Sequence, residues 1–169
     1  MSEKSVKAGR KSQSDKRDEL IASLWEGAID ELELWDSQSN DGWRLLPRAL
    51  PLICRILDAE APKGCPVSQT YMALWFRSFD KGFVETKDKD SIAYESGFSG
   101  QRAVSTWTAR MRIINELGFI SARSGPSGDF QYVLLLNPFT VVQRLYETKE
   151  HDERYRALVA RMLEVGAKW

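Results

Sequence analysis

The sequence is poor in the side chains that metal centres and disulfides need. It holds two cysteines, Cys54 and Cys65, without the Cys-x-x-Cys spacing of zinc and redox motifs, and a single histidine, His151. We therefore expect no bound metal, no disulfide and no cofactor. Both cysteines are predicted to be small buried apolar side chains, and His151, within a run of charges, is predicted to lie at the surface.

A recognisable catalytic arrangement is also missing. Paired carboxylates such as Asp88 and Asp90 lie in a polar stretch beside Lys87 and Lys89, without a nearby histidine or a glycine-rich phosphate loop. These carboxylates are interpreted as solvated loop charges. The sequence therefore predicts that the protein is not an enzyme.

Long apolar runs are absent as well. No run approaches the roughly 18 residues that cross a bilayer, and the polar start, residues 1–4, lacks the apolar stretch of a signal peptide. We expect a cytoplasmic protein. The length of 169 residues allows one well-cored domain with extensions, and 43% hydrophobic residues are typical of globular chains.

Net charge is zero, but the charges are unevenly distributed. Residues 1–16 carry five basic and two acidic side chains in a Ser-rich composition, which predicts a disordered basic tail rather than an arm in the DNA minor groove. Arg17–Asn40 carries one basic and seven acidic side chains, a balance of −6 that would repel phosphate. Gln101–Asn137 carries four arginines and two acidic residues, a balance of +2.

Apolar spacing predicts helices in the first third of the chain. Between Asp18 and Trp35, apolar residues recur every three or four positions, as on one face of an amphipathic helix with an acidic back. Residues 37–42 contain only turn-forming and polar residues and are predicted to be a linker. A second helix is expected to start at Pro47 or Pro51 and to run toward Ala61.

The next segment predicts a helix followed by a short strand. Ser68 is placed to cap a largely apolar helix that extends to about Phe79. Gly82 suits the left-handed position after that helix. Phe83–Thr86 is predicted to be a short strand.

Two helices and a hairpin complete this region. Asp90 is expected to cap a short helix that ends at Gly97, and Ser99 is expected to cap the long helix over 100–117. Trp107, in the apolar stripe of the long helix, is predicted to be a core residue. The hairpin is expected to consist of strands 119–123 and 130–136 around a glycine- and proline-containing turn, 124–129.

A C-terminal helical region follows the hairpin. Asn137 and Pro138 are expected to form its cap and first turn. Apolar spacing resumes after the charged residues 149–154, which leaves open whether the region is one long helix or two. Its apolar stripe, and that of 18–35, either close a two-fold interface between copies or pack on their own domain.

Two local patterns resemble winged-helix regulators of the MarR and GntR kinds. Residues 116–120, Glu-Leu-Gly-Phe-Ile, are similar to the junction between recognition helix and wing, and Ala93 with Gly97 resembles the helix-turn-helix signature. The next apolar position of that signature falls at Ala103, although the periodicity favours Val104 as the core residue. The flanking helices resemble, more vaguely, small regulators carried by plasmids, phages and integrating elements.

The resemblance implies that the long helix enters the major groove while the wing contacts an adjacent groove or the backbone. The candidate residues on or beside the long helix are Ser99, Gln101, Arg102, Ser105, Thr106, Thr108, Ala109, Arg110 and Arg112. Those of the wing are Arg123, Ser124, Ser127 and Gln131. Arginine can pair with guanine and glutamine with adenine, whereas hydroxyls more often position phosphates. The alternative is an ordinary solvated helix face.

The sequence therefore predicts a mainly α fold with a small β-hairpin: a winged helix-turn-helix core with additional N- and C-terminal helices. The expected parts are a disordered basic tail, 1–16; an acidic helix, 17–40; a winged-helix domain, 43–137, with its core motif at 68–137; and C-terminal helices, 138–169. A single short helix reads only a few base pairs, which favours a dimer.

The function expected is sequence-dependent binding of double-stranded DNA, as a transcriptional regulator that works as a homodimer. Two alternatives remain. One is a protein-interaction module, an adaptor or an inhibitor of a DNA-handling machine, which could bind a partner through the acidic N-terminal helix. The other is an accessory factor in plasmid replication, partition or transfer.

Overall fold

The computed structural model describes residues 15–16, 18–26, 34, 40–42 and 45–169. The chain divides into two units, Met1–Trp43 and Arg44–Trp169. In the first unit, residues 15–16 and 18–25 are helical, so helix begins inside the stretch predicted to be a disordered tail. The rest of that tail and most of the predicted acidic helix beyond residue 26 lie outside the described residues.

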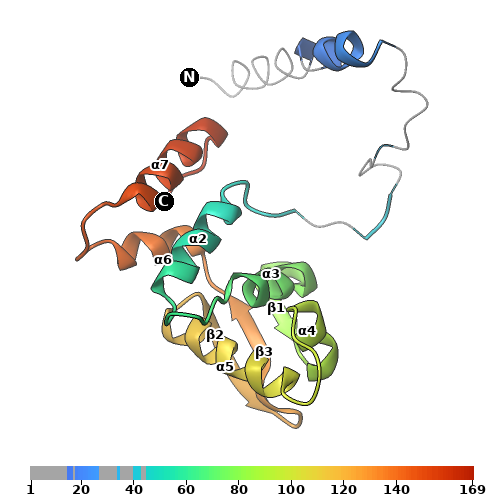
Figure 1. The fold of residues 1–169 in the computed structure, drawn as a ribbon, viewed down its shortest axis with the longest axis vertical. Coiled ribbons are helices and arrows are strands. Elements are labelled where there is room, and N and C mark those ends of the chain that lie inside the picture. Colours follow the sequence, from blue (N-terminus) through green and yellow to red (C-terminus); the bar gives the residue numbers. More distant parts are fainter. Residues whose placement is uncertain (1–14, 17, 27–33, 35–39, 43–44) are drawn as a thin grey trace. The chain divides into compact units, whose positions relative to one another are not determined.

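The second unit is mainly helical with a small antiparallel sheet, as predicted (Figure 1). Its helices are α2 (Leu50–Glu60), α3 (Ser68–Arg77), the 3-10 turn η2 (Asp80–Gly82), α4 (Lys89–Glu95), α5 (Ala103–Glu116), α6 (Pro138–Leu145) and α7 (Glu153–Val165). Its strands are β1 (Phe83–Glu85), β2 (Ile120–Gly125) and β3 (Gly128–Leu135). None of the helices in the described part of the chain is long and apolar enough to cross a membrane.

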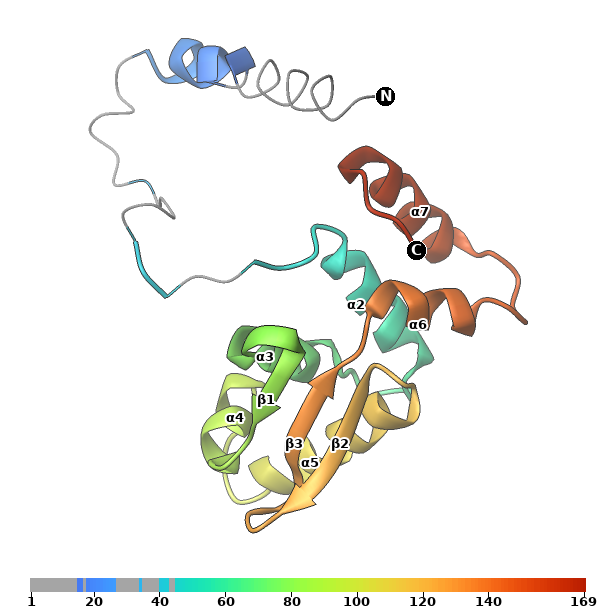
Figure 2. The ribbon, with the colours of Figure 1, turned by 180° about the vertical axis from the view of Figure 1, so that it is seen from behind.

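The strands form one sheet in the order β1-β3-β2. Side chains alternate across it, as the strand repeat of two requires. Val84, Val133 and Leu135 are buried on the face that packs toward the helices, including α5. Figure 2 shows the opposite face of the sheet turned toward the viewer, with α5 behind it. Helices therefore cover only one face of the sheet.

Large apolar side chains from the helices and the sheet meet in a single core. Trp107 of α5 is fully buried, as predicted, and Tyr71 of α3 contacts Phe119 edge-on at a ring-centroid distance of 5.5 Å. Cys54 is also buried, whereas Cys65 is only partly covered, so the prediction that both cysteines are buried holds for one of them.

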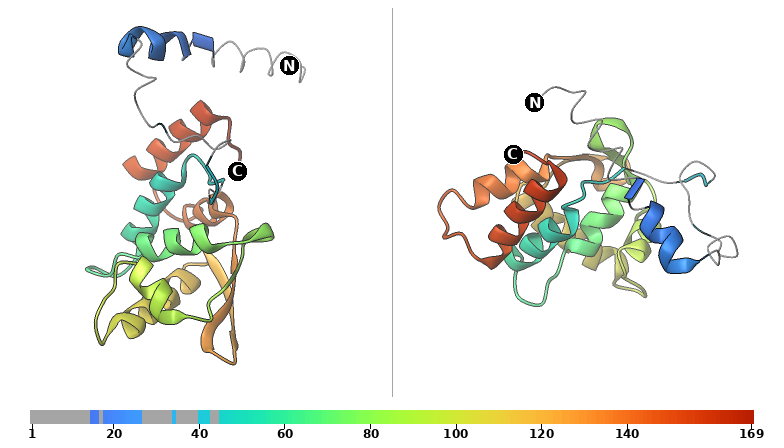
Figure 3. Two further views of the ribbon diagram at one scale, coloured as in Figure 1. Left: turned by 90° about the vertical axis from the view of Figure 1, so that its right-hand side faces the viewer. Right: turned by 90° about the horizontal axis from the view of Figure 1, so that it is seen from above.

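The C-terminal region forms two helices that pack on their own domain. Asn137 caps α6 as predicted, accepting a hydrogen bond from the Phe139 N–H at 3.0 Å, and Asp152 caps α7. Figures 1 and 3 show α7 lying beside α2. Because Val142 and Leu158 are fully buried in the domain core, most of the apolar stripe of this region is not available as a surface between copies.

Helix caps differ from those predicted. Ser68 is the first residue of α3 rather than its cap, and the Asp58 carboxylate of α2 accepts hydrogen bonds from the N–H groups of Val67 and Ser68 at 2.7 and 2.8 Å. Asp88, not Asp90, caps α4, accepting from the Ser91 N–H at 3.0 Å. A cap supplied by another helix has no signature in the local sequence.

Asp58→Ala should lower the free energy of unfolding by about 2 kcal/mol, because it leaves the first N–H groups of α3 without their acceptor. Urea denaturation measures the difference. Asp90→Ala, which removes an exposed carboxylate from the first turn of α4, is the matched control and should change stability by less than about 0.5 kcal/mol. Equal losses in the two variants would contradict a capping role for Asp58.

Candidate nucleic-acid interface

The pair α4 and α5 is joined by a tight turn that depends on glycine. Gly97 has a φ of 83°, and a Cβ there would lie 2.7 Å from the side-chain amide of Gln69. Ala93 and Ala103 are both buried, whereas Val104 is only partly buried. Ala103, the position given by the helix-turn-helix resemblance, is therefore the core residue, and Val104, which the periodicity favours, packs against the core only in part.

The long helix starts later than predicted. Gly100 adopts the left-handed conformation, with a φ of 77°, and its carbonyl accepts from the Ala103 N–H at 3.0 Å. Arg102 is the N-cap residue of α5 and makes no side-chain cap hydrogen bond. Ser99 is thus not a cap, and Gln101 and Arg102 lie in the exposed turn before the helix rather than within it.

One side of α5 is open to solvent. Arg102, Ser105 and Arg112 are exposed and follow the three-and-four spacing of one helix side, with half-buried Ala109 between them. The Ser105 hydroxyl donates to the Arg102 carbonyl at 2.9 Å, which ties the exposed turn to the helix. This side of α5 can approach a ligand without rearrangement of the core.

The other candidates on α5 are less accessible. Thr106, Thr108 and Arg110 are half-buried. The Arg110 guanidinium lies over the Phe98 ring at 5.9 Å, and its buried Nε has no acceptor among the described residues. Arg110 therefore packs on Phe98 in the turn between α4 and α5. Only part of its guanidinium is accessible to a ligand.

The hairpin is longer and tighter than predicted. β2 and β3 extend to Gly125 and Gly128, so the tip consists of Pro126 and Ser127. Phe130 has a φ of 61°, which is unusual for a bulky side chain, close to an irregular register between Arg123 and Gly125. This kink turns the Phe130 ring edge-on toward Trp107, at a centroid distance of 6.4 Å.

Two wing candidates are already engaged within the hairpin. Gln131 is buried, and its Oε1 accepts from the Ser127 N–H at 2.6 Å, so its side chain is not available for the DNA contact predicted for it. The Ser124 hydroxyl donates to the Asp129 carboxylate at 3.1 Å at the exposed edge of the tip. Gln131 thus holds the tip in place from beneath.

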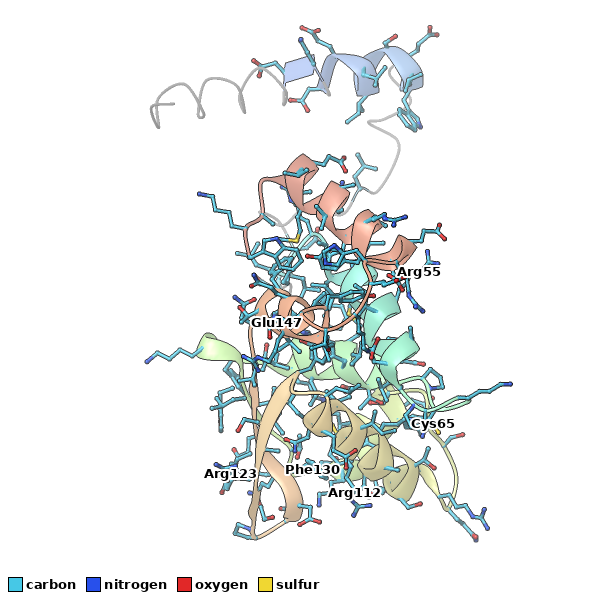
Figure 4. The ribbon with its side chains drawn as sticks, turned by 90° about the vertical axis from the view of Figure 1, so that its left-hand side faces the viewer. Arg55, Cys65, Arg112, Arg123, Phe130 and Glu147 are labelled. Carbon is cyan, nitrogen blue, oxygen red and sulfur yellow. The ribbon has the colours of Figure 1, made fainter. Side chains whose placement is uncertain are left out.

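Arg123 lies in the hairpin as predicted, and Lys89 lies beside the hairpin tip, which the sequence did not indicate. Figure 4 shows Arg123 on the opposite side of the hairpin from Arg112 of α5. The Lys89 ammonium, at the start of α4, lies 3.1 Å from where a Cβ of Gly128 would be. Lys89, which the sequence places only in a polar stretch, therefore adds positive charge beside the hairpin tip.

Other reactive groups are not gathered into a site. Burial raises the pKa of the Cys54 thiol to about 11, so this cysteine is protonated at neutral pH. His151 is exposed, as predicted, and stacks on Tyr155 at 4.1 Å. Among the residues that the structure describes, no three His, Cys, Asp or Glu side chains come together as a metal site would require.

Gln131→Met should accelerate amide hydrogen exchange at Ser127 by roughly fivefold, because methionine fills a similar volume but removes the acceptor beneath the tip. Hydrogen exchange followed by NMR measures this rate. Ser124→Ala, which removes only the exposed hydrogen bond to Asp129, is the control and should leave the Ser127 rate unchanged. An unchanged rate in Gln131→Met would mean that the tip is held by other contacts.

No protein-family model, no curated protein and no solved structure matches this chain. Inferences about function therefore rest on the residues and on the geometry of α4, α5 and the hairpin.

Proposed function

We propose that the protein binds double-stranded DNA in a sequence-dependent way and acts as a transcriptional regulator in the form of a homodimer. The turn and exposed side of α5 enter the major groove, and the hairpin tip contacts the neighbouring backbone or minor groove. The contacts assigned to α5 are made by Gln101, Arg102, Ser105 and Arg112.

The element order supports a winged helix-turn-helix. Helix α3 is followed by β1, the pair α4 and α5, and the hairpin β2-β3, and β3 lies between β1 and β2 in the sheet. In winged-helix proteins the second helix of the pair is the one presented to the groove. By this correspondence α5 is the recognition helix and β2-β3 is the wing.

One observation carries the proposal: the start of α5 and the hairpin tip lie at the same end of the domain. Trp107, in the first half of α5, contacts Phe130, close to the tip, and Lys89 lies beside Gly128. The chain therefore presents a helix start, a hairpin tip and positive charge together. A duplex could be contacted by all three at once.

Electrostatics favour selective rather than indiscriminate binding. The net charge of the segment from Gln101 to Asn137 is only +2. Among the described residues, neither Arg102 nor Arg112 has a carboxylate within ion-pair distance, so both are free to meet phosphates or base edges. Few phosphate contacts mean weak non-specific affinity, so base contacts must supply much of the binding.

A protein-interaction module is the second candidate. The zero net charge of the chain and the −6 balance of Arg17–Asn40 favour it, since a DNA-binding protein is usually basic. An accessory role in plasmid replication, partition or transfer would use the same DNA contacts. Salt dependence separates DNA binding from protein binding, because only DNA releases condensed counterions.

Selection of bound sites from random duplexes should enrich one sequence motif. On that motif, Arg102→Ala should lose roughly 5-fold to 150-fold in affinity, the range expected for a lost bidentate base contact, and Gln101→Ala should relax the preference at one position. Arg55→Ala is the matched control, because Arg55 is exposed on α2 at the other end of the domain from Arg112 (Figure 4).

The control should bind as the wild type does, and wild-type affinity should fall steeply with salt. Absence of an enriched motif, or equal losses in Arg55→Ala and Arg102→Ala, would overturn sequence-dependent recognition by α5. Salt-insensitive binding to a protein, without any shift of duplex DNA, would favour the interaction module.

A further inference from the structure

The face of the sheet that points away from α5 carries large apolar side chains between charged ones. We define the outer sheet face as the side chains that alternate with the buried ones: Phe83, Glu85, Ser121, Arg123, Tyr132 and Leu134. Phe83 is 36% exposed and Leu134 is 45% exposed. An antiparallel sheet with one solvated face usually carries polar residues there, and a gathered apolar patch marks an interaction surface.

Charges on the outer sheet face are arranged in a row. Across the sheet, Tyr132 of β3 is in register with Glu85 of β1 on one side and with Arg123 of β2 on the other. The next row on this face, two residues further along β3, consists of Phe83, Leu134 and Ser121. One edge of the face is therefore acidic and aromatic, and the other is basic and small.

We propose that the outer sheet face packs against the same face of a second copy of this chain, with the two-fold axis parallel to β3. Rotation about that axis exchanges the two edges, so Glu85 of each copy faces Arg123 of the other. It also places each Phe83 ring over the small Ser121 side chain. Apolar Leu134 then meets its own counterpart at the centre.

The charges select this axis over the alternative. A two-fold axis in the interface but perpendicular to β3 would leave β1 over β1 and β2 over β2, so Glu85 and Arg123 would never face each other, and an axis through their row would set like charges opposite one another. The carboxylate of Glu85 also lies 3.1 Å from Lys87 of its own chain, but the Lys87 side chain is 70% exposed. Such an exposed pair is weak and leaves the carboxylate able to accept from arginine.

The same arrangement suits one duplex. Because the axis runs along β3, both hairpin tips and both α5 starts point in the same direction. Facing sheets pack about 10 Å apart, and a helix lies about 10 Å from the sheet it covers, which puts the two α5 helices roughly 30 Å apart. One turn of DNA, about 34 Å, separates successive major grooves on one side of the duplex.

The inference rests on the homodimer of the proposed function, but its test needs no DNA. Sedimentation equilibrium of the full chain should give a dimer at tens of micromolar. Glu85→Arg and Arg123→Glu should each weaken association by roughly tenfold or more, since each puts like charges face to face. The double variant, which exchanges the two charges, should restore association to near the wild-type value.

Apolar variants test the centre of the face. Leu134→Asp should give a monomer, whereas Tyr94→Asp, at a 74% exposed position on α4, should leave the dimer intact. Circular dichroism and thermal unfolding check that each variant is folded. If Leu134→Asp does not fold, the charge exchange decides alone, because Arg123 is exposed and Glu85 is only half-buried.

Three results would overturn the inference: a wild-type monomer at tens of micromolar, a dimer unaffected by both single charge variants, or a double variant that stays dissociated. A monomer that still selects a DNA motif would overturn this interface and leave the proposed function standing. A dimer that responds to the variants as expected but selects no DNA motif would support this interface and overturn the proposed function.

Discussion

The contact between Trp107 and Phe130 fixes the candidate site, because it joins α5 to the hairpin near the ends that both present. Phe130 makes this contact from a backbone with a positive φ, its carbonyl accepts a hydrogen bond from the Thr86 hydroxyl, and the Gln131 side chain beside it accepts from the Ser127 N–H of the tip. A bulky residue in this conformation costs energy that the burial of its ring and the surrounding hydrogen bonds must offset. The angle between α5 and the hairpin is therefore set by packing and not by the two elements separately.

The order of elements could be predicted because it depends on local patterns. Three-and-four spacing identified α2, α3, α5 and the C-terminal helices, and glycine with proline marked the hairpin tip. Features that depend on tertiary contacts could not be predicted. Asp58 caps a helix that starts ten residues later, and Gln131 turns inward to hold Ser127. A polar residue in a strand gives no sign of whether it meets solvent or a buried N–H.

The positions of the candidate residues along the fold were predicted in outline and corrected in detail. Gln101 and Arg102 lie at the start of α5 as expected, but in a turn set by Gly100, whose left-handed conformation the sequence could only suggest. The apolar outer face did have a signal. Residues 132–136 are apolar on both sides of the strand, the pattern of a strand buried on both faces, whereas the domain itself covers only one.

If the protein binds DNA as proposed, pairing of two copies compensates for the small positive charge of each site. A single domain with a balance of +2 would gain little from phosphates, and one short helix would read only a few base pairs. Pairing two domains through the outer sheet face doubles both contributions without adding charge to either chain. In the proposed dimer the distance between the two helices is also fixed, so that a pair of half-sites at the right spacing would bind better than either alone. Selectivity then follows from geometry between copies, which a chain of zero net charge can achieve.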